Sequence, residues 1–265
     1  MQVTVLGCGT SGGVPRISGP GDPSDHGGPG GYWGDCDPSE PRNRRRRVSI
    51  LVEKGDTVLL VDTSPDLRAQ CLDHAIHRLD AVLYTHDHAD HTHGIDELRA
   101  FAVLQRGRVP VYGDRATLAT LRKRFDYAFE STTGYPPICE AHPIGLARFS
   151  LGEVDVVPFE QQHGPVTSLG FRFGSVAYST DLNGLDEAAF QVLDGVDTWI
   201  VDALRYRPHP THANLEQTLS WIERLRPRRA ILTHMTWEMD YQTLLAELPP
   251  GVEPAYDGLV IEHND

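Results

Sequence analysis

The chain has 265 residues, a length at which α/β and sandwich folds commonly form one domain, and a formal charge of −13. This acidic balance disfavours a nucleic acid polymer as partner, because phosphate backbones repel a protein whose basic residues are not clustered. No apolar run reaches the roughly 18 residues of a membrane span, and the first residues do not resemble a signal peptide, so we expect a cytoplasmic location without membrane contact.

Short apolar runs alternate with amphipathic stretches along the whole chain. The runs that predict strands cover residues 2–7, 48–53, 57–62, 81–85, 109–113, 154–159, 168–173, 175–180, 198–203, 229–234 and 258–263. Helical spacing of apolar residues predicts helices over 64–76, 94–104, 114–125, 185–193, 214–225 and 240–248. The interspersed strands and helices indicate an α/β fold in which helices cover layers of sheet, as a single domain over residues 1–265.

The segment 18–35 is more than half glycine and proline, so it has too few apolar side chains to form a helix or strand. We therefore expect a mobile loop over about residues 18–47, next to the functional site. The four cysteines, Cys8, Cys36, Cys71 and Cys139, show no CxxC spacing, which predicts neither a disulfide framework nor a four-cysteine zinc site.

The stretch THDHADHTHG, residues 85–94, places four histidines and two aspartates directly after an apolar run. Imidazole suits zinc, iron, manganese and cobalt, and a carboxylate favours manganese or zinc. Within the stretch, His86 and His88 form one pair of candidate ligands, and Asp90 and His91 form another. Two such pairs predict two metal ions.

One turn cannot complete two coordination spheres, since each ion needs at least three protein ligands and an open position. Isolated polar residues follow later β-like runs, namely His163, Asp181 and His234. Strands would deliver all three to the same edge of a sheet, and the two oxygens of Asp181 could bridge two ions. We therefore add these residues to the candidate metal ligands.

Several motifs together resemble the metallo-β-lactamase superfamily, and within it the phosphoribosyl cyclic phosphodiesterases of the carbon-phosphorus lyase pathway. They are GCGTSGGVP (7–15), NRRRRVSILVE (43–53), LLVDTSPD (59–66), THDHADHTHGIDELR (85–99), YSTD (178–181), HANLEQTL (212–219), LTHM (232–235) and YDGLVIEH (256–263). The resemblance covers nearly the whole chain. It implies an αββα four-layer sandwich with a dinuclear metal site at one edge.

The resemblance also implies a role for each candidate residue. His86, His88 and His163 would hold one ion, Asp90, His91 and His234 the other, and Asp181 would bridge them. Asp62 matches a buried carboxylate that orients a metal ligand from behind. His212 matches a histidine that donates a proton to the leaving group, against the alternative of polar surface at a helix start.

The activity that these residues predict is metal-dependent hydrolysis of a small phosphodiester, either cyclic or of the nucleotide type. Two divalent ions, zinc or manganese with iron as a third candidate, would hold a bridging hydroxide. His212, Asp181 and Asp90 are the residues expected to act in catalysis. The alternatives are a tRNA 3'-processing nuclease, a thioester or lactam hydrolase on the same scaffold, and a non-catalytic metal-binding protein.

Two features depart from the family pattern or leave alternatives open. Close relatives carry a structural zinc that uses three cysteines and a histidine, whereas here Cys36 stands alone and Trp237 replaces the histidine, so we expect no structural zinc and packing of Trp237 against Tyr32 or Trp33 instead. In the run Arg44 to Arg47, Arg44 and Arg46 could contact substrate phosphate or pair with surplus carboxylates. The sequence leaves the oligomeric state open, with a homodimer as one option.

Overall fold

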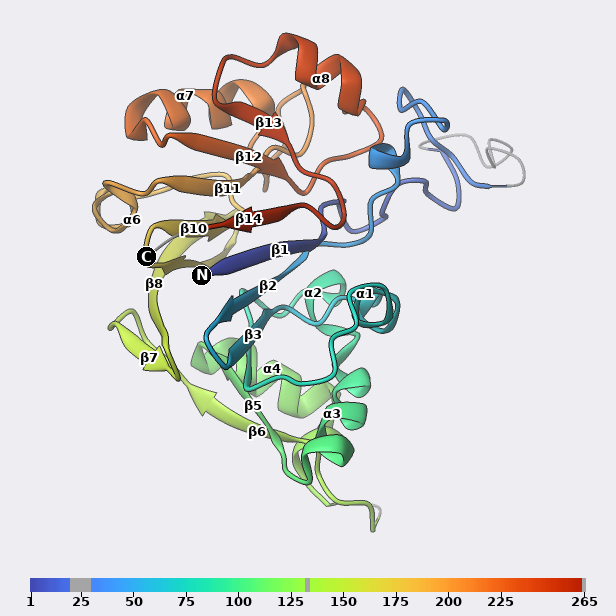
Figure 1. The fold of residues 1–265 in the computed structure, drawn as a ribbon, viewed down its shortest axis with the longest axis vertical. Helices are drawn as coiled ribbons and strands as arrows, with labels where there is room; N and C mark the ends of the chain where they lie inside the picture. The colour runs from blue at the N-terminus through green and yellow to red at the C-terminus, as the bar shows by residue number, and fades with distance from the viewer. Residues whose placement is uncertain (20–29, 132–133, 264–265) are drawn as a thin grey trace.

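Two seven-stranded sheets pack face to face, and helices cover both outer surfaces (Figure 1). The computed structural model describes residues 1–19, 30–131 and 134–263. The first sheet has the order β14 (Val260–Glu262), β1 (Gln2–Gly7), β2 (Ser49–Lys54), β3 (Thr57–Val61), β4 (Ala81–Leu83), β5 (Val109–Gly113) and β6 (Cys139–Pro143). The second has the order β13 (Val252–Pro254), β12 (Arg229–Thr233), β11 (Thr198–Asp202), β10 (Val176–Ser179), β9 (Val166–Phe173), β8 (Val154–His163) and β7 (Phe149–Leu151).

The helices divide between the two outer surfaces. The first sheet is covered by α1 (Leu67–Asp73), α2 (Ala89–Thr92), α3 (Leu98–Gln105), α4 (Arg115–Arg124) and α5 (Asp126–Phe129). The second is covered by α6 (Glu187–Leu193), α7 (Leu215–Leu225) and α8 (Tyr241–Glu247), and short 3-10 turns lie at Pro41–Asn43 and Ile95–Glu97. One apolar cluster fills the space between the sheets, and a second lies beneath the helices of the first sheet. The predicted αββα sandwich is therefore confirmed.

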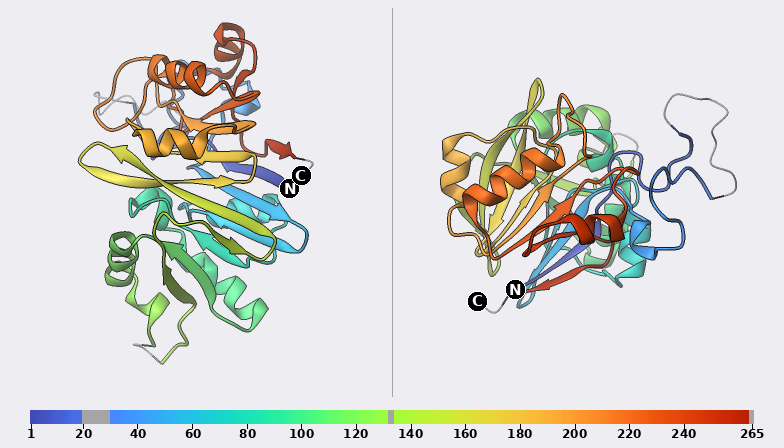
Figure 2. Two further views of the ribbon diagram at one scale, coloured as in Figure 1. Left: turned by 90° about the vertical axis from the view of Figure 1, so that its left-hand side faces the viewer. Right: turned by 90° about the horizontal axis from the view of Figure 1, so that it is seen from above.

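Both sheets pair their strands in the same way. In each, three antiparallel pairings lead into three parallel ones, from β3 to β6 in the first sheet and from β10 to β13 in the second. The carboxyl ends of parallel strands are where open α/β sheets place their ligands. The first and last described residues lie side by side, and the amino group of Met1 donates to the carbonyl oxygen of His263 at 2.7 Å (Figure 2).

Every predicted strand and helix is present, with ends shifted by a few residues. The sequence did not indicate β6, β7 or β13, which are short strands at or near the sheet edges. The strand predicted over 154–159 is too short, because β8 continues through polar residues to His163 and forms a hairpin with β9. Among the described residues, none of the helices is both long and apolar enough to span a membrane.

The segment expected to form a mobile loop contains fixed structure in its described part. Arg45 is 1 % exposed, and its guanidinium donates to the carbonyl oxygens of Thr236 at 3.1 Å and Met239 at 2.6 Å and to Asn43 Oδ1 at 3.2 Å. These bonds tie the segment to the chain that follows β12. Residues 20–29 lie outside the described residues, so the mobility of the stretch 18–47 as a whole stays a prediction.

Trp237 packs as expected from the sequence. Its ring meets that of Tyr32 edge-on at 6.1 Å between centroids, and the guanidinium of Arg16 lies 4.4 Å above it. Gly34 lies so close that a Cβ there would come within 2.1 Å of the indole, in a backbone conformation with φ of +57° that favours glycine. Packing of Trp237 against Tyr32 is thus confirmed, while the absence of a structural zinc stays a prediction.

The neighbours Arg44 and Arg45 form a matched pair for a stability test. Arg45→Met removes three buried hydrogen bonds and leaves the carbonyl oxygen of Met239 without a donor among the described residues, so we expect a loss of at least about 2 kcal/mol in the free energy of unfolding. Arg44→Met changes an exposed side chain that rests on Trp33, so we expect a change within about 0.5 kcal/mol. Urea denaturation of both variants measures the difference, and equal stabilities would contradict a clamping role for Arg45.

Candidate metal centre

Three candidate site residues come directly after parallel strands and have left-handed backbone conformations. Asp62 follows β3, Asp181 lies two residues beyond β10, and His234 follows β12, with φ values of +64°, +54° and +57°. Residues other than glycine rarely adopt such values, and aspartate and histidine do so more often than most others. The local bend at the end of each strand turns the side chain toward the edge where the two sheets meet.

The histidine-rich stretch leaves β4 in an extended conformation and then forms the short helix α2. His88 precedes this helix, and Asp90 and His91 lie within it. Thr92 Oγ1 donates to the carbonyl oxygen of His88 at 2.8 Å, which closes the turn. The guanidinium of Arg124, at the end of α4, donates to the carbonyl oxygen of Asp87 and thereby fixes the link between His86 and His88.

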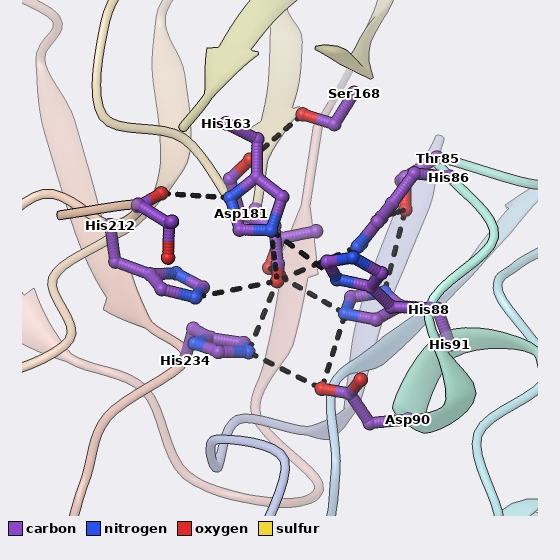
Figure 3. Close-up of polar contacts among 12 residues, drawn as sticks. Thr85, His86, His88, Asp90, His91, His163, Ser168, Asp181, His212 and His234 are labelled. Atoms are coloured by element: carbon purple, nitrogen blue, oxygen red, sulfur yellow. Dashed lines mark hydrogen bonds and ion pairs between the residues drawn. The ribbon is translucent and has the colours of Figure 1, made fainter. Parts of the chain in front are cut away.

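The first group of candidate ligands gathers around Oδ2 of Asp181 (Figure 3). The Nε2 atoms of His86 and His163 lie 3.7 Å and 3.8 Å from this oxygen. Nδ1 of His88 lies 3.3 Å from Nε2 of His163. These four side chains come from three separate parts of the sequence and face one point.

The second group gathers around Oδ1 of the same aspartate. The Nε2 atoms of His91 and His234 lie 3.1 Å and 3.3 Å from this oxygen. Oδ2 of Asp90 lies 3.5 Å from Nε2 of His91 and 3.7 Å from Nε2 of His234. The structure therefore brings all seven predicted ligands together and places Asp181 between the two groups.

These separations fit the spacing of metal ligands. Four ligands at tetrahedral positions lie about 3.4 Å apart when each metal-ligand bond is about 2.1 Å long. The Nε2 atoms of His86, His91 and His234 are buried and have no hydrogen-bond partner among the described residues. Buried polar atoms without partners are costly, so their convergence indicates a bound cation. Nitrogen and carboxylate oxygen donors suit divalent zinc, manganese or iron.

Hydrogen bonds from behind hold two of the imidazoles in position. Asp62 is fully buried and accepts the Nδ1 proton of His91 at 2.7 Å, while it also accepts the amide of Thr85 at 2.8 Å. Nδ1 of His163 donates to the carbonyl oxygen of Thr211 at 2.8 Å. In both residues this leaves Nε2 free to bind a metal. Asp62 therefore lies where the resemblance implied.

The carboxylates give the site a strong negative potential. Burial lowers the pKa of His91, but Asp181, Asp90 and Asp62 outweigh burial and hold this pKa well above its usual value. Burial also lowers the pKa of His234, yet Asp181 and Asp90 raise it to about 9. The same field that attracts protons to these imidazoles attracts a divalent cation.

The sequence did not single out Asp202, the last residue of β11. This fully buried carboxylate accepts the Nδ1 proton of His212 at 2.8 Å and the amide of Leu182 at 3.3 Å. Nε2 of His212 then faces the site and lies 3.8 Å from Oδ2 of Asp181. The missed signal was an aspartate at the end of an apolar strand, the same pattern that identified Asp181.

A cavity of about 370 Å³ opens over both ligand groups. Besides ligands, it is lined by Ser11, Pro165, Val166, Thr211 and His212. Arg44 and Arg46 do not line it. Arg44 rests on the ring of Trp33, and Arg46 pairs with Asp73 at 2.6 Å, so these contacts follow the structural alternative, and a phosphate contact stays a prediction.

Comparison with known proteins defines the class of the molecule. Residues 57–235 match the family model described as the beta-lactamase superfamily domain, so the chain belongs to this superfamily. The crystal structure described as a new diphosphatase from the PhnP family superposes with a TM-score of 0.87 at 34% identity, over 98% of this chain and 96% of that one. The protein is therefore a metallo-β-lactamase superfamily hydrolase close to the PhnP family.

The curated relatives that the chain matches are longer proteins, and they are named as two different kinds of enzyme. An octanoyltransferase of Porphyromonas gingivalis is 31% identical over 98% of this chain but only 51% of its own length. A ribonuclease Z of Methanopyrus kandleri is 28% identical over 48% of this chain and 44% of its own length. The chain thus spans about half the length of the curated relatives it matches.

Metal binding should displace protons from the site. The raised pKa values mean that His91 and His234 hold extra protons at neutral pH, and that His234 loses its extra proton as the pH rises through about 9. A metal ion needs the deprotonated nitrogen, so affinity for Zn²⁺ or Mn²⁺ should rise between about pH 7 and about pH 9. Calorimetric titration of the metal-free protein, in buffers of different ionisation enthalpy, measures the protons released. Affinity that does not change with pH, without proton release, would contradict this account.

Proposed function

We propose that the protein is a dinuclear metal-dependent hydrolase that cleaves small phosphodiesters, of the cyclic or nucleotide type. The observation that carries this proposal is the position of His212. Its Nε2 faces the shared carboxylate Asp181, and its Nδ1 is bound to the buried Asp202. A proton donor beside a pair of metal sites is what cleavage of a P–O bond with an alkoxide leaving group requires.

The proposal assigns one ion to each ligand group, with zinc or manganese as the first candidates and iron as the third. When bound, such ions lower the pKa of a coordinated water and neutralise phosphoryl oxygens. Asp181 fixes the distance between the two groups through its two oxygens. Asp90 completes the second group from the rim, where its side chain is 13% exposed.

Asp202 and His212 would supply the proton for the leaving oxygen. Since Asp202 accepts the Nδ1 proton, the Nε2 atom is the one that can carry a proton toward the cavity. The buried carboxylate also stabilises the positive charge of the imidazolium before transfer. Asp202 is thus a positioning residue, while His212 touches the reacting ester.

A second candidate substrate is a diphosphate, because the relative that is 34% identical over nearly its whole length is described as a diphosphatase. The reaction would again cleave a P–O bond, with a phosphate as leaving group. Nuclease activity has weaker support, since the ribonuclease Z relative matches about half of this chain and the formal charge is −13. Thioester hydrolysis, which gives no role to a proton donor at His212, and metal binding without catalysis are the remaining alternatives.

The leaving group offers the sharpest test of this proposal. On a diester with an alkoxide leaving group, His212→Ala should lower kcat by about 10²- to 10⁴-fold, because an alkoxide needs a proton. On bis(p-nitrophenyl) phosphate the loss should be below about tenfold, since p-nitrophenolate leaves unprotonated. Asp202→Asn should also lower kcat more on the alkoxide diester than on bis(p-nitrophenyl) phosphate, but by a smaller factor than His212→Ala.

His209→Ala is the matched control, because this ring lies 5.2 Å from that of His212 but does not line the cavity. Metal content is measured for each variant. Equal losses on both diesters would contradict proton donation by His212. Turnover of a thioester or RNA, without turnover of small phosphate esters, would contradict the proposed substrate class.

A further inference from the structure

The cavity over the metal ligands lies near the lower end of the size range of ligand cavities. Its volume of about 370 Å³ must contain the ions and the reacting phosphate, whereas ligand cavities range from about 300 to about 1,000 Å³. A second cavity, of about 560 Å³, lies on the other side of the β8–β9 hairpin tip. Pro165 and Val166 line both cavities, so the tip forms a ridge between them.

The ridge is held in place on both sides. The amide of Gly164 donates to Oδ1 of Asn183 at 3.1 Å. A Cβ on Gly164 would lie 2.5 Å from Cγ2 of Thr211, so the tip packs tightly against the segment that carries His212. Val166 remains 46% exposed at the top of the ridge. A bound ester could therefore cross the ridge, with its phosphate on one side and its organic part on the other.

The second cavity is lined by α4 and by the histidine-rich stretch. His86 contributes from the metal site, and Thr117 contributes from the first turn of α4. Thr117 is 5% exposed, and its amide donates to Asp114 at 2.7 Å. Its hydroxyl makes no hydrogen bond to another described residue, and its oxygen is not one of the fully buried atoms that lack a partner. Solvent therefore reaches this hydroxyl at the wall of the cavity, where it is available for a hydrogen bond to a ligand.

The charges of the cavity narrow the class of that ligand. Asp87 and Asp114 both line it, no arginine or lysine is among its described lining residues, and the guanidinium of Arg124 is paired with Asp87. The lining therefore carries a negative balance that disfavours an anionic group. Gln162, Thr120 and Thr167 add groups that can donate or accept hydrogen bonds. An uncharged group with hydroxyls fits this lining.

We propose that the second cavity binds the uncharged, hydroxyl-bearing part of the ester, which crosses the ridge at Pro165 and Val166. Thr117 contacts this part of the substrate and selects for it. The proposal rests on the phosphodiesterase function given above. It adds a specificity site that is separate from the metal ligands.

Three diesters that share p-nitrophenol as leaving group test this site. They carry a glyceryl, a propyl or a 2-carboxyethyl group, which have the same number of carbon atoms. The metal-loaded protein should cleave the glyceryl ester with a kcat/KM about tenfold above that of the propyl ester, as expected for one or two hydrogen bonds. The 2-carboxyethyl ester should fall below the propyl ester.

Thr117→Val should bring the ratio of glyceryl to propyl rates close to one, and Thr117→Ser should keep it, because serine retains the hydroxyl. Binding of glycerol 1-phosphate and propyl phosphate, measured by calorimetry, should show the same pattern without turnover. Equal rates and affinities for the glyceryl and propyl compounds would overturn the specificity site and leave the proposed function intact. Failure to cleave any diester would overturn the proposed function itself.

Discussion

The carboxylate of Asp181 is the interaction on which the rest of the site depends. It is 2% exposed, and each of its two oxygens faces imidazole nitrogens from a different ligand group at 3.1 to 3.8 Å. Three of these nitrogens are buried without a hydrogen-bond partner in the described part of the chain. Such a cluster is costly to bury unless cations fill the space between its members. Metal binding is therefore expected to stabilise the fold as well as to enable chemistry.

The position of the site follows from how the sheets are built. Parallel strands from both sheets end at a common edge, and the residues just beyond β3, β10 and β12 turn sharply into it. The left-handed conformations of Asp62, Asp181 and His234 are unfavourable for such residues, so packing in the rest of the sandwich has to maintain them. The clamp formed by Arg45 has a related role, because it holds the chain immediately after His234.

The sequence predicted the seven side chains that the structure brings together, because candidate metal ligands leave a dense and regular signal. The spacing of His86, His88, Asp90 and His91 is rare in ordinary turns, and its partners follow apolar runs. Asp202 also ends an apolar run, but its role was missed because that role depends on a contact with His212 that only the folded chain creates. The same limit applied to Arg45, since a run of arginines does not reveal which side chain is buried. Strands such as β6 escaped notice because an edge strand buries few side chains, so its sequence shows little apolar alternation.

Counting the ions tests the account most directly. Purified protein reconstituted with Mn²⁺ should contain two ions per chain, and its electron paramagnetic resonance spectrum should show magnetic coupling between them, since one carboxylate links the two sites. Asp181→Ala should abolish the coupling. One ion per chain, or two ions without coupling, would contradict the claim that Asp181 joins a pair of adjacent metal sites.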